Sequence, residues 1–162
     1  MMLEIAIWSL LIAIGVSDAQ DNRISNKAVL LLLVMVTANV MYVSESNGLD
    51  HLYSGVVTFA VCFILYLLKV MAGGDVKLLA VLGFWLGPES MSQAVPLIIV
   101  SGGVVGLFYL AQHLASSRNT FGEQIKAYAV QKVTPGWKNN QRMVIPFAPA
   151  IVIGLAYYFY IH

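Results

Sequence analysis

Two acidic residues, Asp18 and Asp75, stand out in this sequence because each lies at the edge of an apolar segment. They are 57 positions apart, and two expected membrane crossings between them place both at the same membrane face. An ionised carboxylate at the centre of a membrane helix costs about 2.5–3.5 kcal/mol, so some interaction must offset that cost. Two carboxyl groups that lie close together cannot both ionise easily and therefore share one proton.

Such a pair is suited to aspartic-protease chemistry. The charged carboxyl takes a proton from water, and the neutral one donates a proton to the carbonyl oxygen of the peptide bond being cleaved. This reaction needs no metal, no cofactor and no covalent acyl intermediate. The sequence contains no plausible Ser-His-Asp set, HExxH motif or phosphate-binding loop that would predict a different chemistry.

Other interpretations of these aspartates stay open at this point. Asp75 precedes an expected helix, so its side chain could serve as the helix cap. Asp18 could be a solvated loop charge paired with Arg23, and Asp21 is a rival for the same role.

The neighbours of Asp75 add detail to the catalytic hypothesis. Gly73 and Gly74 come directly before it, and glycine allows a backbone to approach a ligand closely. An extended peptide could then hydrogen-bond to the exposed backbone, although a plain hinge between two helices would use the same glycines. Lys77 could stabilise a nearby carboxylate or extend toward lipid headgroups.

Composition indicates the surroundings in which these residues work. Of the 162 residues, 59% are apolar and only 10% are charged, whereas a soluble domain carries about 25% charged residues. The bulk solvent is therefore expected to be lipid. The formal net charge of +1, with no dominant basic patch, argues against a nucleic-acid partner. The single cysteine, Cys62, is predicted to be a small buried apolar residue without a disulfide.

Apolar runs predict six membrane helices in one all-α domain that spans residues 1–162. The expected segments are Met2–Ser17, Ala28–Ser44, Leu52–Met71, Val76–Leu86, Ala94–Leu114 and Val144–Ile161. The first run lacks a basic start, so it is predicted to be a membrane helix rather than a signal peptide. The fourth is short and ends at Gly87-Pro88, followed by a turn to Gln93. In the long connection 116–142, residues 122–133 could form an amphipathic surface helix or an ordinary connector.

The distribution of lysine and arginine residues predicts how the protein is oriented across the membrane. With six spans, all nine lysine and arginine residues fall at one membrane face, and the other face has none. The positive-inside rule places the cationic face in the cytoplasm, so both termini are expected outside. Asp18 and Asp75 are then expected to face the cytoplasm from a multi-pass membrane protein.

Three segments resemble motifs of the type IV prepilin peptidases. Residues Met71–Leu78 (MAGGDVKL) resemble the GxGDxKL motif, and Asp18–Asn26 resembles an aspartate followed by a basic stretch and Ile-Pro-Asn. Val144–Ala150 resembles the Pro-Phe-Gly-Pro element that opens the last helix of that family. Ala72 and Ser25 depart from the family glycine and proline. The resemblance spans nearly the whole chain, and the short length is most similar to the branch serving tight-adherence (Flp-type) pili.

The resemblance implies an intramembrane aspartic endopeptidase with Asp18 and Asp75 as its catalytic residues. Spacing from the Ile24-Ser25-Asn26 segment favours Asp18 over Asp21. The residues expected around the substrate are Gly73, Gly74, Lys77 and Asn26. The implied substrate is a prepilin or pseudopilin, whose basic leader is removed at the cytoplasmic face of the bacterial inner membrane. The resemblance implies that cleavage falls just before the hydrophobic N-terminal helix of the pilin. Longer relatives also methylate the new N-terminus and carry an extra cytoplasmic domain with paired cysteines, so peptidase activity alone is predicted for this chain.

Two functions from other classes remain as alternatives. A small proton- or ion-translocating subunit would use intramembrane acids as a relay, but a relay expects carboxylates near the midplane. All eight acidic residues are instead expected at helix ends or in loops. A subunit of a secretion complex without chemistry would tolerate loss of both aspartates. Membrane lipid is an expected partner in every case, and the oligomeric state is left open.

Overall fold

The computed structural model describes residues 2–43, 48–116 and 146–162, and the regular structure in these ranges is helical. The chain divides into two units, one made of residues 1–102 with 146–162 and the other of residues 103–145. The helices are α1 (Met2–Asp21), α2 (Asn26–Val43), α3 (Gly48–Leu67), α4 (Gly73–Ser116) and α6 (Ala148–Ile161). Residues 103–116 of α4 are the described part of the second unit.

The helices have the composition of a membrane protein. Three are long and apolar enough to cross a bilayer, namely Met2–Asp21, Gly48–Leu67 and 73–112, and α2 and α6 are shorter apolar helices. Large apolar side chains such as Leu30 and Val34 are mostly exposed, which water would not tolerate over so much of a surface. The all-α prediction is confirmed, and these helices agree with a membrane protein.

The first helix is longer than the sequence predicts. We expected a helix ending at Ser17 and a loop from Asp18, but α1 continues to Asp21. It ends because Asn22 adopts a left-handed conformation, with φ of 50°, and donates its N–H to the Asp18 carbonyl oxygen. Asp18 therefore lies on a helix rather than in the charged loop that the sequence predicts.

The third helix starts and ends earlier than predicted. It covers Gly48–Leu67 instead of ending at Met71. Lys69 has φ of 59°, and the backbone N–H groups of Lys69 and Val70 bond back to the last turn, to Tyr66 and Leu65. This is the Schellman arrangement that satisfies the free carbonyls at a helix end.

One residue interrupts α4. Gly87 has φ of 76° and ψ of 175°, so the chain changes direction there and the helix resumes at once instead of forming the predicted turn to Gln93. Pro88 has no N–H to donate to the Phe84 carbonyl one turn earlier. His51 of α3 takes that place, with its Nδ1 2.9 Å from the Phe84 oxygen. The predicted end of a helix at Gly87-Pro88 therefore coincides with a real break.

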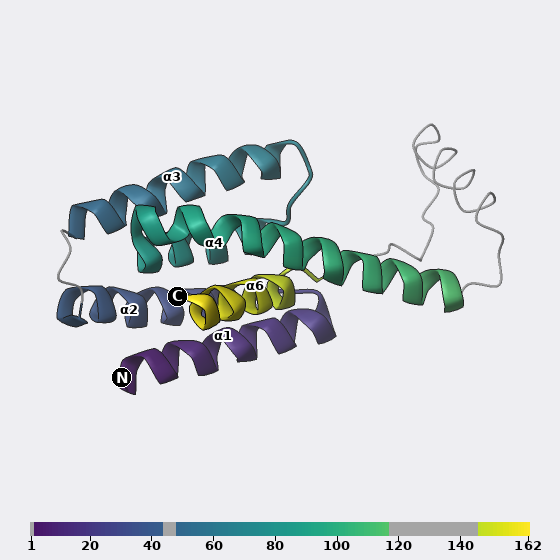
Figure 1. Cartoon of the computed structure of the whole chain (residues 1–162), viewed down its shortest axis with the longest axis horizontal. Helices are drawn as coiled ribbons and strands as arrows, with labels where there is room; N and C mark the ends of the chain where they lie inside the picture. Colours follow the sequence, from purple (N-terminus) through teal and green to yellow (C-terminus); the bar gives the residue numbers. More distant parts are fainter. Residues whose placement is uncertain (1, 44–47, 117–145) are drawn as a thin grey trace. The chain divides into compact units, whose positions relative to one another are not determined.

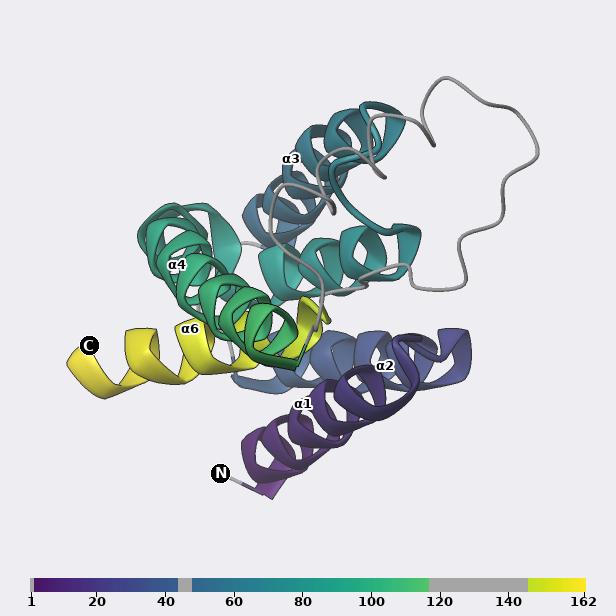
Figure 2. The same ribbon diagram turned by 90° about the vertical axis from the view of Figure 1, so that its right-hand side faces the viewer.

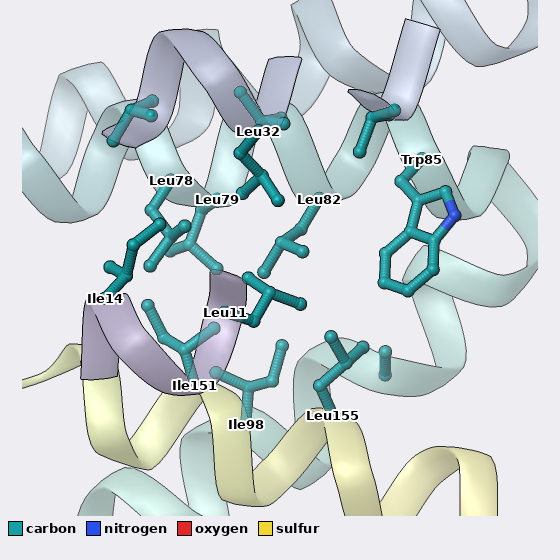
Figure 3. Close-up of a cluster of buried hydrophobic side chains, with 14 of the residues drawn as sticks. Leu11, Ile14, Leu32, Leu78, Leu79, Leu82, Trp85, Ile98, Ile151 and Leu155 are labelled. Atoms are coloured by element: carbon teal, nitrogen blue, oxygen red, sulfur yellow. The ribbon is translucent and has the colours of Figure 1, made fainter. Parts of the chain in front are cut away.

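In the first unit, helices pack around a core of apolar side chains (Figure 3). The labelled residues are Leu11, Ile14, Leu32, Leu78, Leu79, Leu82, Trp85, Ile98, Ile151 and Leu155. They come from α1, α2, α4 and α6, and α1 lies beside both α2 and α6 (Figures 1 and 2). The core thus ties together helices that are distant in sequence.

Small residues allow the closest helix contacts. A Cβ on Gly83 of α4 would lie 2.5 Å from the Thr58 hydroxyl of α3, and one on Gly154 of α6 would lie 2.6 Å from the Ile98 Cα of α4. Without a hydrophobic drive between helices in lipid, such close backbone packing is a main source of association.

The last helix begins later than predicted. α6 starts at Ala148, with a proline in its first turn, instead of at Val144. Residues 144–145 and the predicted amphipathic segment 122–133 lie outside the described residues.

Candidate active site

The structure brings Asp18 and Asp75 together. Asp18 lies in the last turn of α1 and Asp75 in the first turn of α4, and each is only 6% exposed. Their carboxyl groups are close enough for the charge of Asp18 to act on Asp75. The alternative of Asp18 as a solvated loop charge is therefore wrong. We call these two residues the aspartate pair.

Asp18 is held by the N-terminus of another helix. The backbone N–H of Ala148, the first residue of α6, donates to Asp18 Oδ2 at 3.0 Å. Phe147 occupies the capping position of α6 but forms no side-chain cap bond. A carboxyl from α1 thus takes the role that a helix usually gives to its own capping residue. The free N–H groups and the dipole at a helix N-terminus favour a carboxylate oxygen there.

Asp75 does not cap its own helix. The Ala72 carbonyl accepts the N–H groups of Asp75 at 3.1 Å and Val76 at 3.3 Å, so Ala72 occupies the capping position. Asp75 is the third residue of α4, and the prediction that it could be the cap is wrong. Its direction is therefore set by the first helical turn.

The two glycines before Asp75 have different surroundings. A Cβ on Gly74 would lie 3.0 Å from the Ile24 Cβ, whereas one on Gly73 would come no closer than 3.5 Å to the Tyr66 ring. Both lie in α4, and Gly87 is the one glycine in residues 2–43, 48–116 and 146–162 with a positive φ. Gly74 therefore allows α4 to pack against the connection between α1 and α2, which fixes Asp75 relative to α1.

The remaining predicted site residues contact each other. Lys77 Nζ donates to Asn26 Oδ1 at 2.9 Å, and this exposed bond joins α4 to the first residue of α2. Lys77 thus has a protein partner in Asn26, whereas one interpretation of the sequence had its side chain extend only toward the lipid headgroups. Asp21, the alternative to Asp18 as the catalytic residue, is the last residue of α1, and its side chain is exposed. Burial and the electrostatic contact with Asp75 both favour Asp18.

Sequence reasoning missed three neighbours of the aspartate pair. The Ala148 N–H is a backbone group, which no residue type reveals. Cys62 is buried as predicted, at 6% exposure, but it also interacts electrostatically with Asp75. Phe147 comes next to Ala148, and only the resemblance of residues 144–150 to a family element pointed to that region.

Comparisons with known proteins show which family the sequence resembles. The sequence matches the type IV leader peptidase family over residues 5–111. A protein of Bacillus subtilis (strain 168) named "Prepilin leader peptidase/N-methyltransferase" is 29% identical over 158 residues, covering 92% of this chain and 52% of that protein. Proteins of the same name from two strains of Burkholderia pseudomallei are 48% identical over 50 residues, covering 27% of this chain and 16% of theirs.

The chain spans at most about half the length of these curated relatives. No solved structure matches it. The family match covers most of the chain and includes both members of the aspartate pair. Because the family match covers most of the sequence, the chain belongs to the type IV leader peptidase family.

Proposed function

We propose that this chain is an intramembrane aspartic endopeptidase that removes the N-terminal leader peptide of prepilin or pseudopilin proteins. The observation that carries the proposal is the buried aspartate pair. Asp18 lies at the C-terminal end of α1 and Asp75 at the N-terminal end of α4, and the two carboxyl groups interact electrostatically. The family to which the chain belongs and the names of its relatives support a leader peptide as substrate.

The proposed reaction uses the two carboxyl groups with one shared proton. The ionised carboxyl takes a proton from water, and the resulting hydroxide adds to the carbonyl carbon of the scissile bond. The neutral carboxyl protonates the carbonyl oxygen, giving a tetrahedral intermediate. Proton transfer to the amide nitrogen then releases the leader and the new N-terminus. The Ala148 N–H keeps the Asp18 carboxyl in one orientation during these steps.

The proposed topology has six spans, with both termini outside and the aspartate pair at the cytoplasmic face of the inner membrane. The break at Gly87 supports two crossings within α4. The distribution of the cations favours the cytoplasmic side for the aspartate pair, and a basic leader would remain on that side.

The test is cleavage of a purified prepilin by the reconstituted protein, followed by the size shift on a gel. Asp18→Asn and Asp75→Asn should each lower the rate at least about 100-fold, because acid–base catalysis contributes about 10²–10⁴-fold. Asp21→Asn is the matched control, since this exposed carboxyl lies one turn from Asp18. Wild-type rates in either of the first two variants would contradict the proposal.

Two finer assignments remain predictions. The chain is proposed to cleave without methylating the new N-terminus, and mass spectrometry of the mature pilin would contradict this by showing an added methyl group. The tight-adherence branch is proposed from the resemblance alone. Cleavage of a conventional type IV prepilin in preference to an Flp-type prepilin would contradict that assignment.

A further inference from the structure

An apolar groove lies between α3 and α4 in the first unit, with a volume of about 390 Å³. We call it the α3–α4 groove, and its lining includes Val57, Cys62, Leu79, Met91, Val95 and Phe147. Val57 and Val95 are about two-fifths exposed, so the groove is open along its side. In a bilayer that side offers lateral entry to a membrane-embedded segment.

Three residues that line the α3–α4 groove lie near the aspartate pair. Leu79 follows Asp75 by four residues, so the two lie on the same face of α4 one turn apart. Cys62, on α3, interacts electrostatically with Asp75. Phe147 adjoins Ala148, whose N–H binds Asp18. These three residues place one end of the groove next to the aspartate pair, although neither aspartate itself lines the groove.

The size of the groove determines what it can hold. Its wall on α3 extends from Tyr53 to Leu65, about 18 Å of helix. A helix of that length and about 10 Å diameter occupies about 1,400 Å³, far more than the groove encloses. The groove can therefore take the side chains along one face of a helix, and its lining selects apolar ones.

We propose that the α3–α4 groove receives one face of the substrate's apolar helix, the segment that follows the cleaved bond. Its N-terminal end then lies at Asp18 and Asp75, and the basic leader extends away from the groove. This inference rests on the proposed function, because it assigns the binding surface for the same substrate. It names the part of the substrate that the protein recognises and the surface that does so.

A second groove, between α2 and α3, is larger, at about 580 Å³, and is assigned no part in binding the substrate helix. Its lining on α4 consists of Lys77, Ala80, Val81 and Phe84. At about 100° per residue these positions centre on the face of α4 opposite Asp75. A helix seated there would have its end on the wrong side of α4 for the aspartate pair.

Adjacent residues of α3 provide a matched pair of variants. Val57 lines the α3–α4 groove and Val56 lines the α2–α3 groove, and both are substantially exposed. Val57→Trp should fill the first groove and raise the KM for a purified prepilin about tenfold, whereas Val56→Trp should change it less than about twofold. Unchanged thermal unfolding in both variants would confirm intact folding. An equal or reversed effect on KM would overturn the assignment.

Cys62 allows a direct test of contact, because it is the single cysteine of the chain and lines the α3–α4 groove. Prepilins carrying one cysteine at successive positions after the cleavage site would be oxidised with copper phenanthroline in membranes. Disulfides to Cys62 should recur every three or four positions, as one helix face requires. The control combines Cys62→Ser with Leu30→Cys, which places the thiol in the α2–α3 groove.

The outcomes separate this inference from the proposed function. Capture by Leu30→Cys but not by Cys62, with normal cleavage by the wild type, would overturn the groove and leave the peptidase intact. No capture at Cys62 and no effect of Val57→Trp would show that the substrate helix does not occupy the groove, which also overturns the inference. Failure of the wild type to cleave any prepilin would overturn the proposed function itself.

Discussion

The close contact of α6 with α4 at Gly154 gives a prediction whose size follows from the geometry. A Cβ added in Gly154→Ala would lie 2.6 Å from the Ile98 Cα and 2.7 Å from the Ser101 hydroxyl. An ordinary carbon–carbon contact is roughly 3.5 Å, so α6 and α4 must separate by about 0.9 Å. The Ser101 hydroxyl also donates to the Ala150 carbonyl at 2.6 Å, and this bond would be strained by the same movement.

That separation should affect both stability and catalysis. Overpacking costs about 1–3 kcal/mol, and the better helix propensity of alanine returns about 0.5–1 kcal/mol. A net loss of about 1–2 kcal/mol in the free energy of unfolding lowers the melting temperature by about 2–8 °C. A shift of α6 by about 1 Å also moves the Ala148 N–H away from Asp18, and a misplacement of that size can cost about 100-fold in rate.

The assays are thermal unfolding in detergent, followed by tryptophan fluorescence, and prepilin cleavage in proteoliposomes. Gly103→Ala is the control, since a Cβ there would meet nothing within 4 Å. It should keep the wild-type cleavage rate and gain slightly in stability. If Gly154→Ala cleaves and melts like the wild type, then the close packing of α6 does not hold the aspartate pair in place.

Two further predictions concern other contacts. Gly74→Ala should slow cleavage about tenfold because its Cβ meets the Ile24 Cβ at 3.0 Å, while Gly73→Ala should change the rate less than about twofold; similar rates in both would contradict this. Trp85→Phe should lower the free energy of unfolding by about 1–3 kcal/mol, because it removes the indole N–H bond to buried Asn39. Adding Asn39→Leu to Trp85→Phe should recover part of that loss in thermal unfolding, and a further loss would refute the explanation.

The sequence was sufficient for features that depend on residue type. Apolar runs predicted helices, and Gly87-Pro88 predicted the break in α4, because proline removes a backbone donor and glycine tolerates the positive φ. Counting expected membrane crossings placed Asp18 and Asp75 at one membrane face, but it could not predict that the two side chains lie close together. Each of these predictions rests on a local property of the chain or on a simple rule of topology.

Features that depend on backbone geometry could not be predicted in the same way. The end of α1 rests on a left-handed Asn22, and asparagine adopts that conformation in only some of its occurrences. The Ala148 N–H that binds Asp18 belongs to a backbone group that almost every residue carries. The two grooves differ by which face of α4 they use, and this requires knowing where α3 packs.

The site forms where helix ends meet, and the chemistry of lipid explains why. Inside a bilayer, backbone groups along a helix are already paired, so free N–H donors are available only at helix N-termini. The N-terminus of α6 supplies such a donor to Asp18, and the first turn of α4 carries Asp75. The position of both carboxyl groups therefore depends on how the ends of three helices are aligned. Close contacts such as the one at Gly154 set that alignment, which is why a methyl group remote from the reacting atoms is expected to slow the reaction.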